Sequence, residues 1–483
     1  MKLLFISILI FIAVFSKAQT VSIYGNAKSY AGDELSFYTF TDLITYNKKT
    51  ISTFKVASNG DFKCTIFITE TIPAYIDLET SEGEIYLEPN KNYQIELPDK
   101  KSKEIKDKIN PYYKQTAFYL KIIDAKKEDL NKQIANFNDA FHQYLSENFL
   151  EIYKNGRKSN VDTAIQVIDS IFTDTINSYF INYKKYKFGL LRNVAYQRDI
   201  NMVTRAYFLN NPILYNNTSY MDFFNQVYTK YFNYFKQSKE GKTIYSDITY
   251  EKSFKVLKET LSKNYNLSKN EAFQELVILK GLYDAFYSED YHKKPILQIL
   301  DSIIVQSTIP IHVEMAKNIK KNVTIMLKGY PAPAFELYDS DENKITNTYY
   351  KDKYVYLNFS STISFACKEE LMLYNDLYKK YGDKIEFVTI ACDENFKDAQ
   401  SYFKKNNFKW TLLDFTNQPD IIIKYNIKAY PTYYLVNPEG KLVLTPAPSP
   451  KENIDFYFAK MTNPGRKESD IDELFKLKEE KEK

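Results

Sequence analysis

Near the start of this chain of 483 residues, apolar and polar positions alternate. From Val21 to about Pro98 the alternation occurs in short runs such as VSIYG, DFKCTIFI and GEIYLEP, and a period of two is typical of strands that bury one face. Ser58-Asn59-Gly60 lies between two of these runs and predicts a hairpin, because Asn and Gly tolerate positive φ. We therefore expect residues 19–104 to form a β-rich domain, an N-terminal antiparallel β-sandwich.

From residue 105 to residue 327 the apolar residues recur with helical spacing instead. One helix face is formed by Phe254, Leu257, Leu261 and Tyr265, which lie at i, i+3, i+7 and i+11. This period predicts amphipathic helices packed against one another. We expect a central all-α domain whose role is packing, and the chain shows no fixed repeat period that would indicate a repeat array.

The pattern changes again over residues 328–462. Strand-like runs, KYVYLNF, IEFVTIAC and TYYLVN, alternate with the helical stretches KEELMLYNDLYKKYG and ENFKDAQSYFKKNN. Such alternation is typical of βαβ units and predicts a C-terminal α/β domain with an at least partly parallel sheet. Residues 463–483 are highly charged and are expected to form a solvated tail.

The first residues, 1–18, have the features of a secretory signal peptide. Lys2 precedes a largely apolar run at residues 3–15, and Ser16 and Ala18 stand at the −3 and −1 positions of a cleavage site. The run is short for a membrane span, although a retained anchor is the alternative, and no later stretch reaches about 18 apolar residues. We expect a protein exported to the periplasm, with no membrane span after cleavage.

Charge and histidine spacing narrow the functional classes. The 65 basic residues nearly balance the 61 acidic ones, so nucleic acid is not an expected partner. His142, His292 and His312 are far apart and lack a ligand spacing, so we expect no metal site and no Ser-His hydrolase. The GKT at residues 241–243 lacks the first Gly of a phosphate loop, and we expect no cofactor.

Three cysteines are present, and only two of them are candidates for chemistry. Cys64 alternates onto one face with Phe62 and Ile66, which predicts a buried core thiol. The remaining pair is Cys367 and Cys392.

Residues 329 to about 460 resemble the TlpA-like thioredoxin family. The resembling segments are GYPAPAFELYDSDENK, KYVYLNFSSTISFACKEELMLYNDLYKKYGDKIEFVTIACDEN and YNIKAYPTYYLVNPEGKLV, about a quarter of the chain. The layout of a β-rich domain and a helical insert before this module resembles exported proteins of Bacteroidetes-type bacteria. The resemblance implies a thioredoxin-like fold for the C-terminal domain.

The family's chemistry uses two cysteines spaced C-x-x-C at a helix N-terminus, where the first attacks a disulfide and the second resolves the mixed disulfide. Here Ser364 stands at the attacking position and Cys367 at the resolving one. A serine hydroxyl cannot form a disulfide, and we expect Ser364 to cap the helix instead. Asn358 lies where many thioredoxins carry a buried acid.

One further motif matches the family. Tyr430-Pro431-Thr432 corresponds to its cis-proline loop, which faces the active site and pairs with an extended substrate peptide. The alternative is that Pro431 only holds the fold together. Cys392 follows a predicted strand and is the candidate disulfide partner of Cys367.

The leading hypothesis is an exported thioredoxin-like protein with a degenerate S-x-x-C site that is redox-inactive rather than an enzyme. It would bind proteins or peptides of the cell envelope. The alternative is a residual thiol-disulfide oxidoreductase that uses Cys367, with Cys392 as partner. A third hypothesis is a structural envelope protein in which the module is inert.

Overall fold

The computed structural model describes residues 19–154, 157–173, 175–196 and 199–462. The expected signal peptide and charged tail lie outside these described residues. The chain divides into two compact units, of which the first comprises Met1–Lys101 and Gln115–Lys320, and the second Ser102–Lys114 and Lys321–Lys483. A short excursion from the first part of the chain therefore belongs to the second unit.

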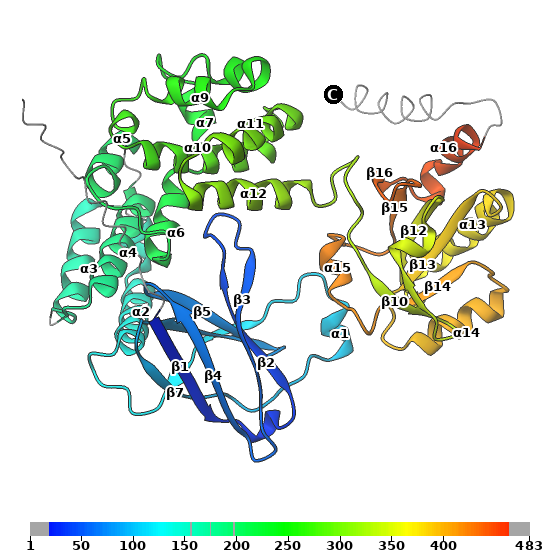
Figure 1. Ribbon diagram of the computed structural model, residues 1–483, viewed down its shortest axis with the longest axis horizontal. Helices are drawn as coiled ribbons and strands as arrows, with labels where there is room; N and C mark the ends of the chain where they lie inside the picture. Colours follow the sequence, from blue (N-terminus) through cyan, green and yellow to red (C-terminus); the bar gives the residue numbers. More distant parts are fainter. Residues whose placement is uncertain (1–18, 155–156, 174, 197–198, 463–483) are drawn as a thin grey trace, which may run out of the picture. The chain divides into compact units, whose positions relative to one another are not determined.

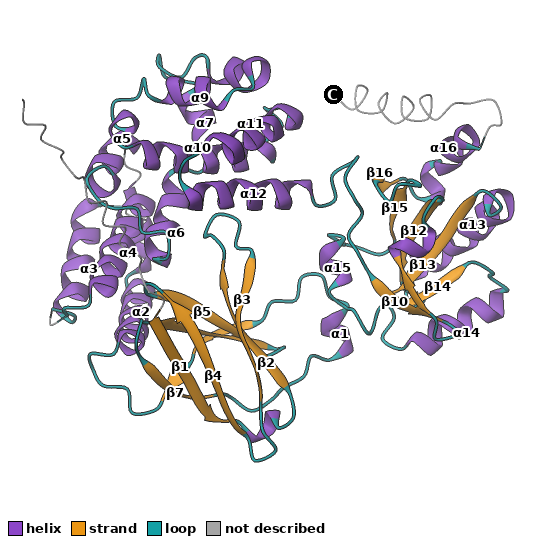
Figure 2. Ribbon diagram, in the orientation of Figure 1, coloured by secondary structure: helices purple, strands orange, loops and turns teal. Residues whose placement is uncertain are grey.

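The strands of the first unit form a four-stranded sheet, β4-β1-β7-β9, and a five-stranded sheet, β3-β2-β5-β6-β8 (Figures 1 and 2). Val21 of the first sheet and Phe37 and Ile76 of the second lie in one buried cluster, so the two sheets share a core. The bounds of the strands are β1 Gln19–Asn26, β2 Glu34–Phe40, β3 Lys48–Lys55, β4 Asp61–Ile68, β5 Ile72–Asp77, β6 Ser81–Leu87, β7 Asn92–Glu96, β8 Thr116–Tyr119 and β9 Lys121–Ile122.

Three details of this region differ from the sequence predictions. The Asn59-Gly60 turn forms, with Gly60 at φ +91°, but the predicted hairpin is wrong because β3 pairs with β2 and β4 with β1. The pairs β1–β7 and β6–β8 are parallel rather than antiparallel, which requires a connection longer than a tight turn. Strands β8 and β9 also lie beyond residue 104, where only helices were expected.

Helices make up the rest of the first unit. The first turn of α2 is joined to the β-region, because the Asn131 amide accepts from the Tyr86 N–H at 2.6 Å and donates to the Tyr86 carbonyl at 2.9 Å. The bounds are α2 Leu130–Glu147, α3 Lys158–Ser170, α4 Ser178–Tyr196, α5 Ile200–Val203, α6 Thr218–Val227, α7 Tyr231–Phe235, α8 Ile244–Ser246, α9 Phe254–Leu261, α10 Glu271–Phe286, α11 Lys293–Gln306 and α12 Pro310–Thr324.

The helices can be compared with two predictions, the apolar face that begins at Phe254 and the lack of a later membrane span. Phe254, Leu257 and Leu261 are buried on α9 as predicted, whereas Tyr265 lies after the helix and is exposed. None of the helices in the described ranges is both long enough and apolar enough to cross a membrane.

The second unit is built on a seven-stranded sheet in the order β11-β10-β14-β13-β12-β15-β16. Strands β12, β13 and β14 are parallel, and β15 is antiparallel to β12, which confirms the predicted α/β domain with a partly parallel sheet. The strands are β10 Glu336–Asp339, β11 Lys344–Thr346, β12 Tyr354–Ser360, β13 Ile385–Ala391, β14 Thr411–Asp414, β15 Thr432–Val436 and β16 Leu442–Ala447. The helices are α1 Ile105–Lys108, α13 Phe365–Tyr381, α14 Phe396–Asn406, α15 Ile421–Lys424 and α16 Ile454–Met461.

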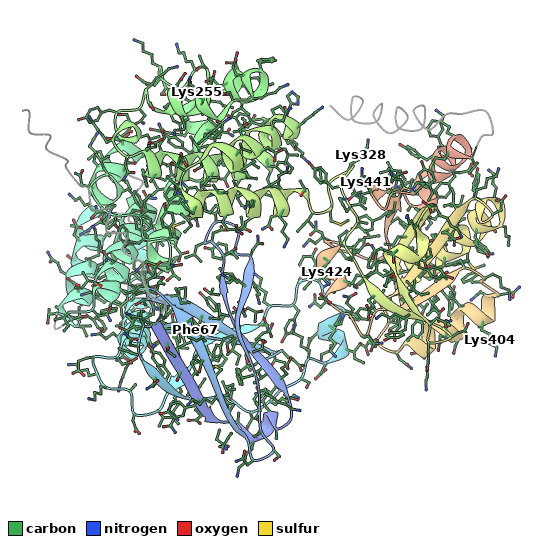
Figure 3. All side chains as sticks on the ribbon, viewed as in Figure 1. Phe67, Lys255, Lys328, Lys404, Lys424 and Lys441 are labelled. Atoms are coloured by element: carbon green, nitrogen blue, oxygen red, sulfur yellow. The ribbon has the colours of Figure 1, made fainter. Side chains whose placement is uncertain are left out.

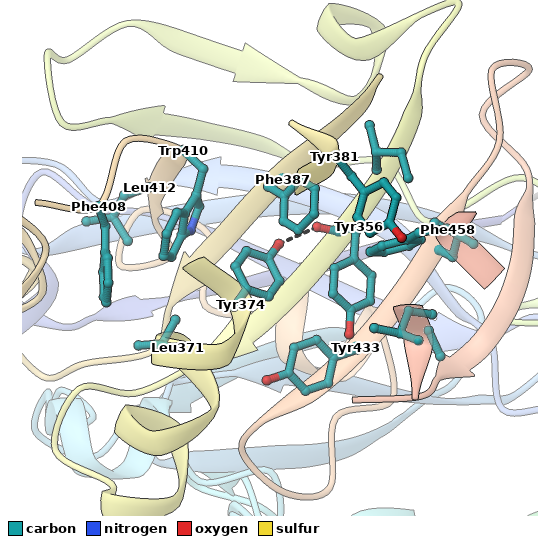
Figure 4. Close-up of a cluster of buried hydrophobic side chains, with 14 of the residues drawn as sticks. Tyr356, Leu371, Tyr374, Tyr381, Phe387, Phe408, Trp410, Leu412, Tyr433 and Phe458 are labelled. Atoms are coloured by element: carbon teal, nitrogen blue, oxygen red, sulfur yellow. Dashed lines mark hydrogen bonds between the residues drawn. The ribbon is translucent and has the colours of Figure 1, made fainter. Parts of the chain in front are cut away.

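Successive residues of β12 face opposite sides of this sheet. Tyr356 stacks on Tyr374 of α13 with ring centroids 5.2 Å apart, and the Tyr374 hydroxyl donates to the Tyr356 carbonyl (Figure 4). Leu357 and Phe359 belong to the buried cluster on the other side of the sheet. This packing fixes the position of α13 relative to the end of β12, where the predicted site residues lie.

Candidate functional site

The turn between β12 and α13 carries the two residues of the S-x-x-C motif. Ser364 is the N-cap of α13, with extended backbone at φ −73° and ψ 128°. Its Oγ accepts from the Cys367 N–H, with 3.4 Å between the oxygen and the nitrogen. The hydroxyl therefore satisfies one of the free donors of the first helical turn, as the sequence predicted.

Cys367 lies in the first turn of α13 and is 0% exposed. A thiol without access to solvent cannot meet a disulfide of another protein unless the turn opens. The structure thus places a capping hydroxyl, rather than a reactive thiol, toward the surface at this motif.

Cys392 follows β13 and is also buried, and both cysteines are free thiols. Ala391 packs in the cluster that contains α13, whereas Cys392 packs in the cluster on the other side of the sheet. Burial raises the pKa of the Cys392 thiol far above its ordinary value. Cys367 and Cys392 are free thiols in the structure, and a disulfide between them stays a prediction.

A buried carboxylate, Asp393, holds the turn before α13. One of its oxygens accepts from the Thr362 N–H at 2.8 Å and from the Thr362 hydroxyl at 2.6 Å, and the Ser361 hydroxyl donates to it at 3.4 Å. Burial raises the pKa of Asp393, and the hydrogen bonds from Thr362 oppose that shift. Asp393 was not predicted from the sequence, where the only signal was an acid directly after an apolar strand.

Glu370 is a second buried acid that was not predicted from the sequence. It lies three residues after Cys367 on α13, so both side chains point from the same helix face. One carboxylate oxygen accepts from the Ser449 hydroxyl at 3.4 Å, and the other has no hydrogen-bond partner among the described residues. Burial raises its pKa. The i, i+3 spacing from Cys367 was the available signal.

The Tyr430–Pro431 peptide bond is cis, as the family resemblance implied. Thr432 begins β15 and pairs with Phe359 of β12, so this loop lies next to the turn that holds Ser364. The Tyr430 hydroxyl donates to the carbonyl of Ile109 at 3.1 Å. Ile109 was not singled out in the sequence, because it lies more than three hundred positions before Tyr430.

Large apolar side chains are exposed on both sides of Ser364. Ile363 is 65% exposed and Phe365 is 75% exposed. The surface of this unit also carries lysines such as Lys404 and Lys441 (Figure 3) and other exposed apolar side chains such as Ile423. Neighbouring exposed apolar side chains are typical of surfaces that bind other proteins.

A cavity of about 460 Å³ lies elsewhere in the same unit. It is lined by Val355 near the start of β12 and Val436 at the end of β15, at the opposite end of the sheet from Ser364. The cavity therefore does not belong to the site at the turn. Among the residues that the structure describes, no three His, Cys, Asp or Glu side chains are grouped as metal ligands would be.

Comparisons with known proteins agree with this geometry, which defines a thioredoxin-fold domain. Residues 328–445 match the AhpC/TSA family. The thiol-disulfide oxidoreductase ResA of Bacillus cereus is 30% identical over 136 residues, which cover 28% of this chain and 78% of that protein. The thioredoxin-like protein YneN of Bacillus subtilis is 30% identical over 124 residues, 25% of this chain and 71% of that protein.

A solved structure of a thiol-disulfide oxidoreductase from Bacteroides fragilis is 21% identical and covers 27% of this chain and 99% of its own, with a TM-score of 0.25. Through its C-terminal domain, the chain belongs to the TlpA-like thioredoxin-fold family of thiol-disulfide oxidoreductases.

Proposed function

We propose that the C-terminal domain binds extended segments of other exported proteins without covalent chemistry. The binding surface comprises the Ser364 turn and the Tyr430–Pro431 loop. The observation that carries the proposal is the capping hydroxyl of Ser364 between two exposed apolar side chains, Ile363 and Phe365. Such a surface supplies apolar contacts but no accessible thiolate.

The reaction of the family requires a nucleophilic sulfur that a substrate disulfide can reach. Ser364 has no sulfur, and Cys367 is fully buried behind it. These two observations support a site that is redox-inactive. The residues for peptide binding are Tyr430, Pro431 and Thr432, because an extended segment beside this loop could pair with its backbone.

The remaining parts of the chain have supporting roles in this proposal. The β-sandwich and the helical domain add binding surface, and the protein acts in the periplasm after export by its signal peptide. The partners are therefore unfolded or extended segments of cell-envelope proteins.

The alternative function is a residual thiol-disulfide oxidoreductase that uses Cys367, with Cys392 as partner. This alternative is favoured by the similarity to ResA of Bacillus cereus, which is named a thiol-disulfide oxidoreductase. It predicts that Cys367→Ala abolishes activity and that a mixed disulfide with a partner can be trapped.

The two functions are separated by assaying insulin reduction and binding of a labelled, reduced and carboxymethylated α-lactalbumin. We expect the wild type to bind the unfolded protein and to leave insulin unreduced, and the double variant Ile363→Ser, Phe365→Ser to bind at least tenfold more weakly. Ser364→Cys should gain reductase activity if the rest of the site is intact. Reduction of insulin by the wild type at the rate of an ordinary thioredoxin would overturn the proposal.

A further inference from the structure

The segment Ser102–Lys114, which we call the strap, belongs to the second unit although the residues before and after it belong to the first. It contains the short helix α1 and then turns at Asn110, whose side-chain oxygen accepts from the Tyr112 N–H at 2.9 Å. Figure 1 shows α1 in cyan beside α15 in orange. A loop between β7 and β8 is therefore packed on the thioredoxin-fold domain.

The strap contacts the cis-proline loop directly. Ile109 packs against the buried cluster that contains Cys392 and Ile422, and Tyr430 packs against the same cluster. The Ile109 carbonyl accepts from the Tyr430 hydroxyl at 3.1 Å. The hydroxyl of Tyr430, the residue before the cis-proline, is therefore hydrogen-bonded to a backbone carbonyl from a distant part of the chain.

One further contact extends this docking along the strap. The Lys428 ammonium lies 5.8 Å from the centre of the Tyr112 ring, within reach of a cation–π attraction. The strap therefore also contacts a residue two positions before Tyr430.

The strap buries little of its surface against the rest of the second unit. Within Ser102–Lys114, all of which the structure describes, no side chain is buried, and Tyr112 is 65% exposed. A segment with so little burial is stabilised mainly by being tethered, because a tether supplies an effective concentration of about the millimolar range. A partner with similar contacts could displace it.

We propose that the strap is an internal ligand of the cis-proline surface and that a partner segment binds by displacing it. This inference rests on the proposed binding function and defines the class of partner. The partner would be an extended segment with an aliphatic residue at the Ile109 position, a free carbonyl on that residue for the Tyr430 hydroxyl, and an aromatic residue three positions later for Lys428.

Variants of the full chain test the competition. In the first, a Gly/Ser linker of equal length replaces Ser102–Lys114. In the second, Ile109→Ser removes the anchoring side chain but keeps the strap. Ile105→Ser is the matched control, because Ile105 lies on the same segment and is 40% exposed. We expect the first two variants to bind carboxymethylated α-lactalbumin about tenfold more tightly than the wild type, about 1.4 kcal/mol, and the control to bind as the wild type does.

A labelled peptide with the strap sequence, SKEIKDKINPYYK, provides a second measurement. It should bind the linker variant and bind the wild type at least tenfold more weakly, and a peptide with Ser in place of the anchoring Ile should bind neither. Equal binding of α-lactalbumin to the wild type and both strap variants would overturn the competition and leave the proposed function standing. Binding of the peptide to the linker variant, with no binding of α-lactalbumin to any form, would support strap docking and refute the proposed function.

Discussion

Asn358 and Tyr433 face each other across β12 and β15, and both are buried beside α13. Neither the nitrogen nor the oxygen of the Asn358 amide has a hydrogen-bond partner among the described residues. A buried polar group without a partner costs about 1–3 kcal/mol. The buried amide of Asn358 therefore lowers the stability of the second unit.

Replacement of Asn358 by Leu, a side chain of similar shape, should remove that cost. We expect Asn358→Leu to raise the free energy of unfolding of the second unit by about 1 kcal/mol. The only tryptophan, Trp410, is buried in this unit, so its fluorescence reports unfolding there in urea. The contrasting variant is Thr389→Val, which leaves the Trp410 N–H without its acceptor at 2.9 Å and should lower stability by about 1 kcal/mol. Destabilisation by Asn358→Leu would mean that the amide is satisfied in solution.

Glu370 should make the second unit more stable as the pH falls. Burial raises its folded-state pKa above the ordinary value of 4.5, so the folded state binds the proton more tightly than the unfolded state does. The resulting stability is fully present below the ordinary pKa and is lost as the pH rises through the folded-state pKa. Glu370→Gln should weaken the dependence of the unfolding free energy on pH and raise that free energy at pH 7 by about 1 kcal/mol. The test is urea unfolding of wild type and variant, followed by Trp410 fluorescence between pH 4 and pH 8. The same pH dependence of the unfolding free energy in both proteins would contradict the prediction.

All three thiols should resist modification in the native protein. Cys64, Cys367 and Cys392 are free and buried, and burial raises the pKa of Cys64 to about 11. An increase of two units in pKa lowers the thiolate fraction roughly 100-fold at neutral pH. We expect slow reaction with Ellman's reagent in native buffer and rapid reaction of three thiols in guanidinium chloride. Fewer than three thiols after unfolding without reductant would indicate a disulfide.

Loss of the cap at Ser364 should weaken the start of α13. We expect Ser364→Ala to lower the free energy of unfolding of the second unit by about 0.5–1 kcal/mol and Ser364→Asp to retain the cap. Ser401→Ala is the control, because Ser401 is exposed within α14, where alanine favours the helix. Equal effects of the two alanine substitutions in urea titrations would show that the Ser364 hydroxyl contributes nothing as a cap.

The sequence was most informative where short-range rules apply. The alternation of strands and helices predicted the α/β domain, and the residue type at the helix start predicted the Ser364 cap. Both features depend on neighbours a few positions apart, whose preferences act locally. The cis bond at Tyr430-Pro431 was implied by the family resemblance instead.

The features that the sequence did not reveal depend on contacts between distant segments. Asp393 bonds to a turn thirty-one positions earlier, and the two parallel strand pairs of the first unit join strands that are separated by other elements. Gly60 illustrates the limit, because its turn was predicted correctly and yet the strands on either side pair with other partners. Periodicity identifies elements but does not assign their neighbours.

The strap also affects how this protein can be divided for study. The family match begins at residue 328, and a fragment cut there would lack residues 102–114. The contact surface of Ile109 would then be bare, together with the apolar turn at Ile363 and Phe365. Such a fragment should bind other proteins and itself more strongly than the intact chain does, because more apolar surface is exposed. Binding and solubility therefore need to be compared in both forms.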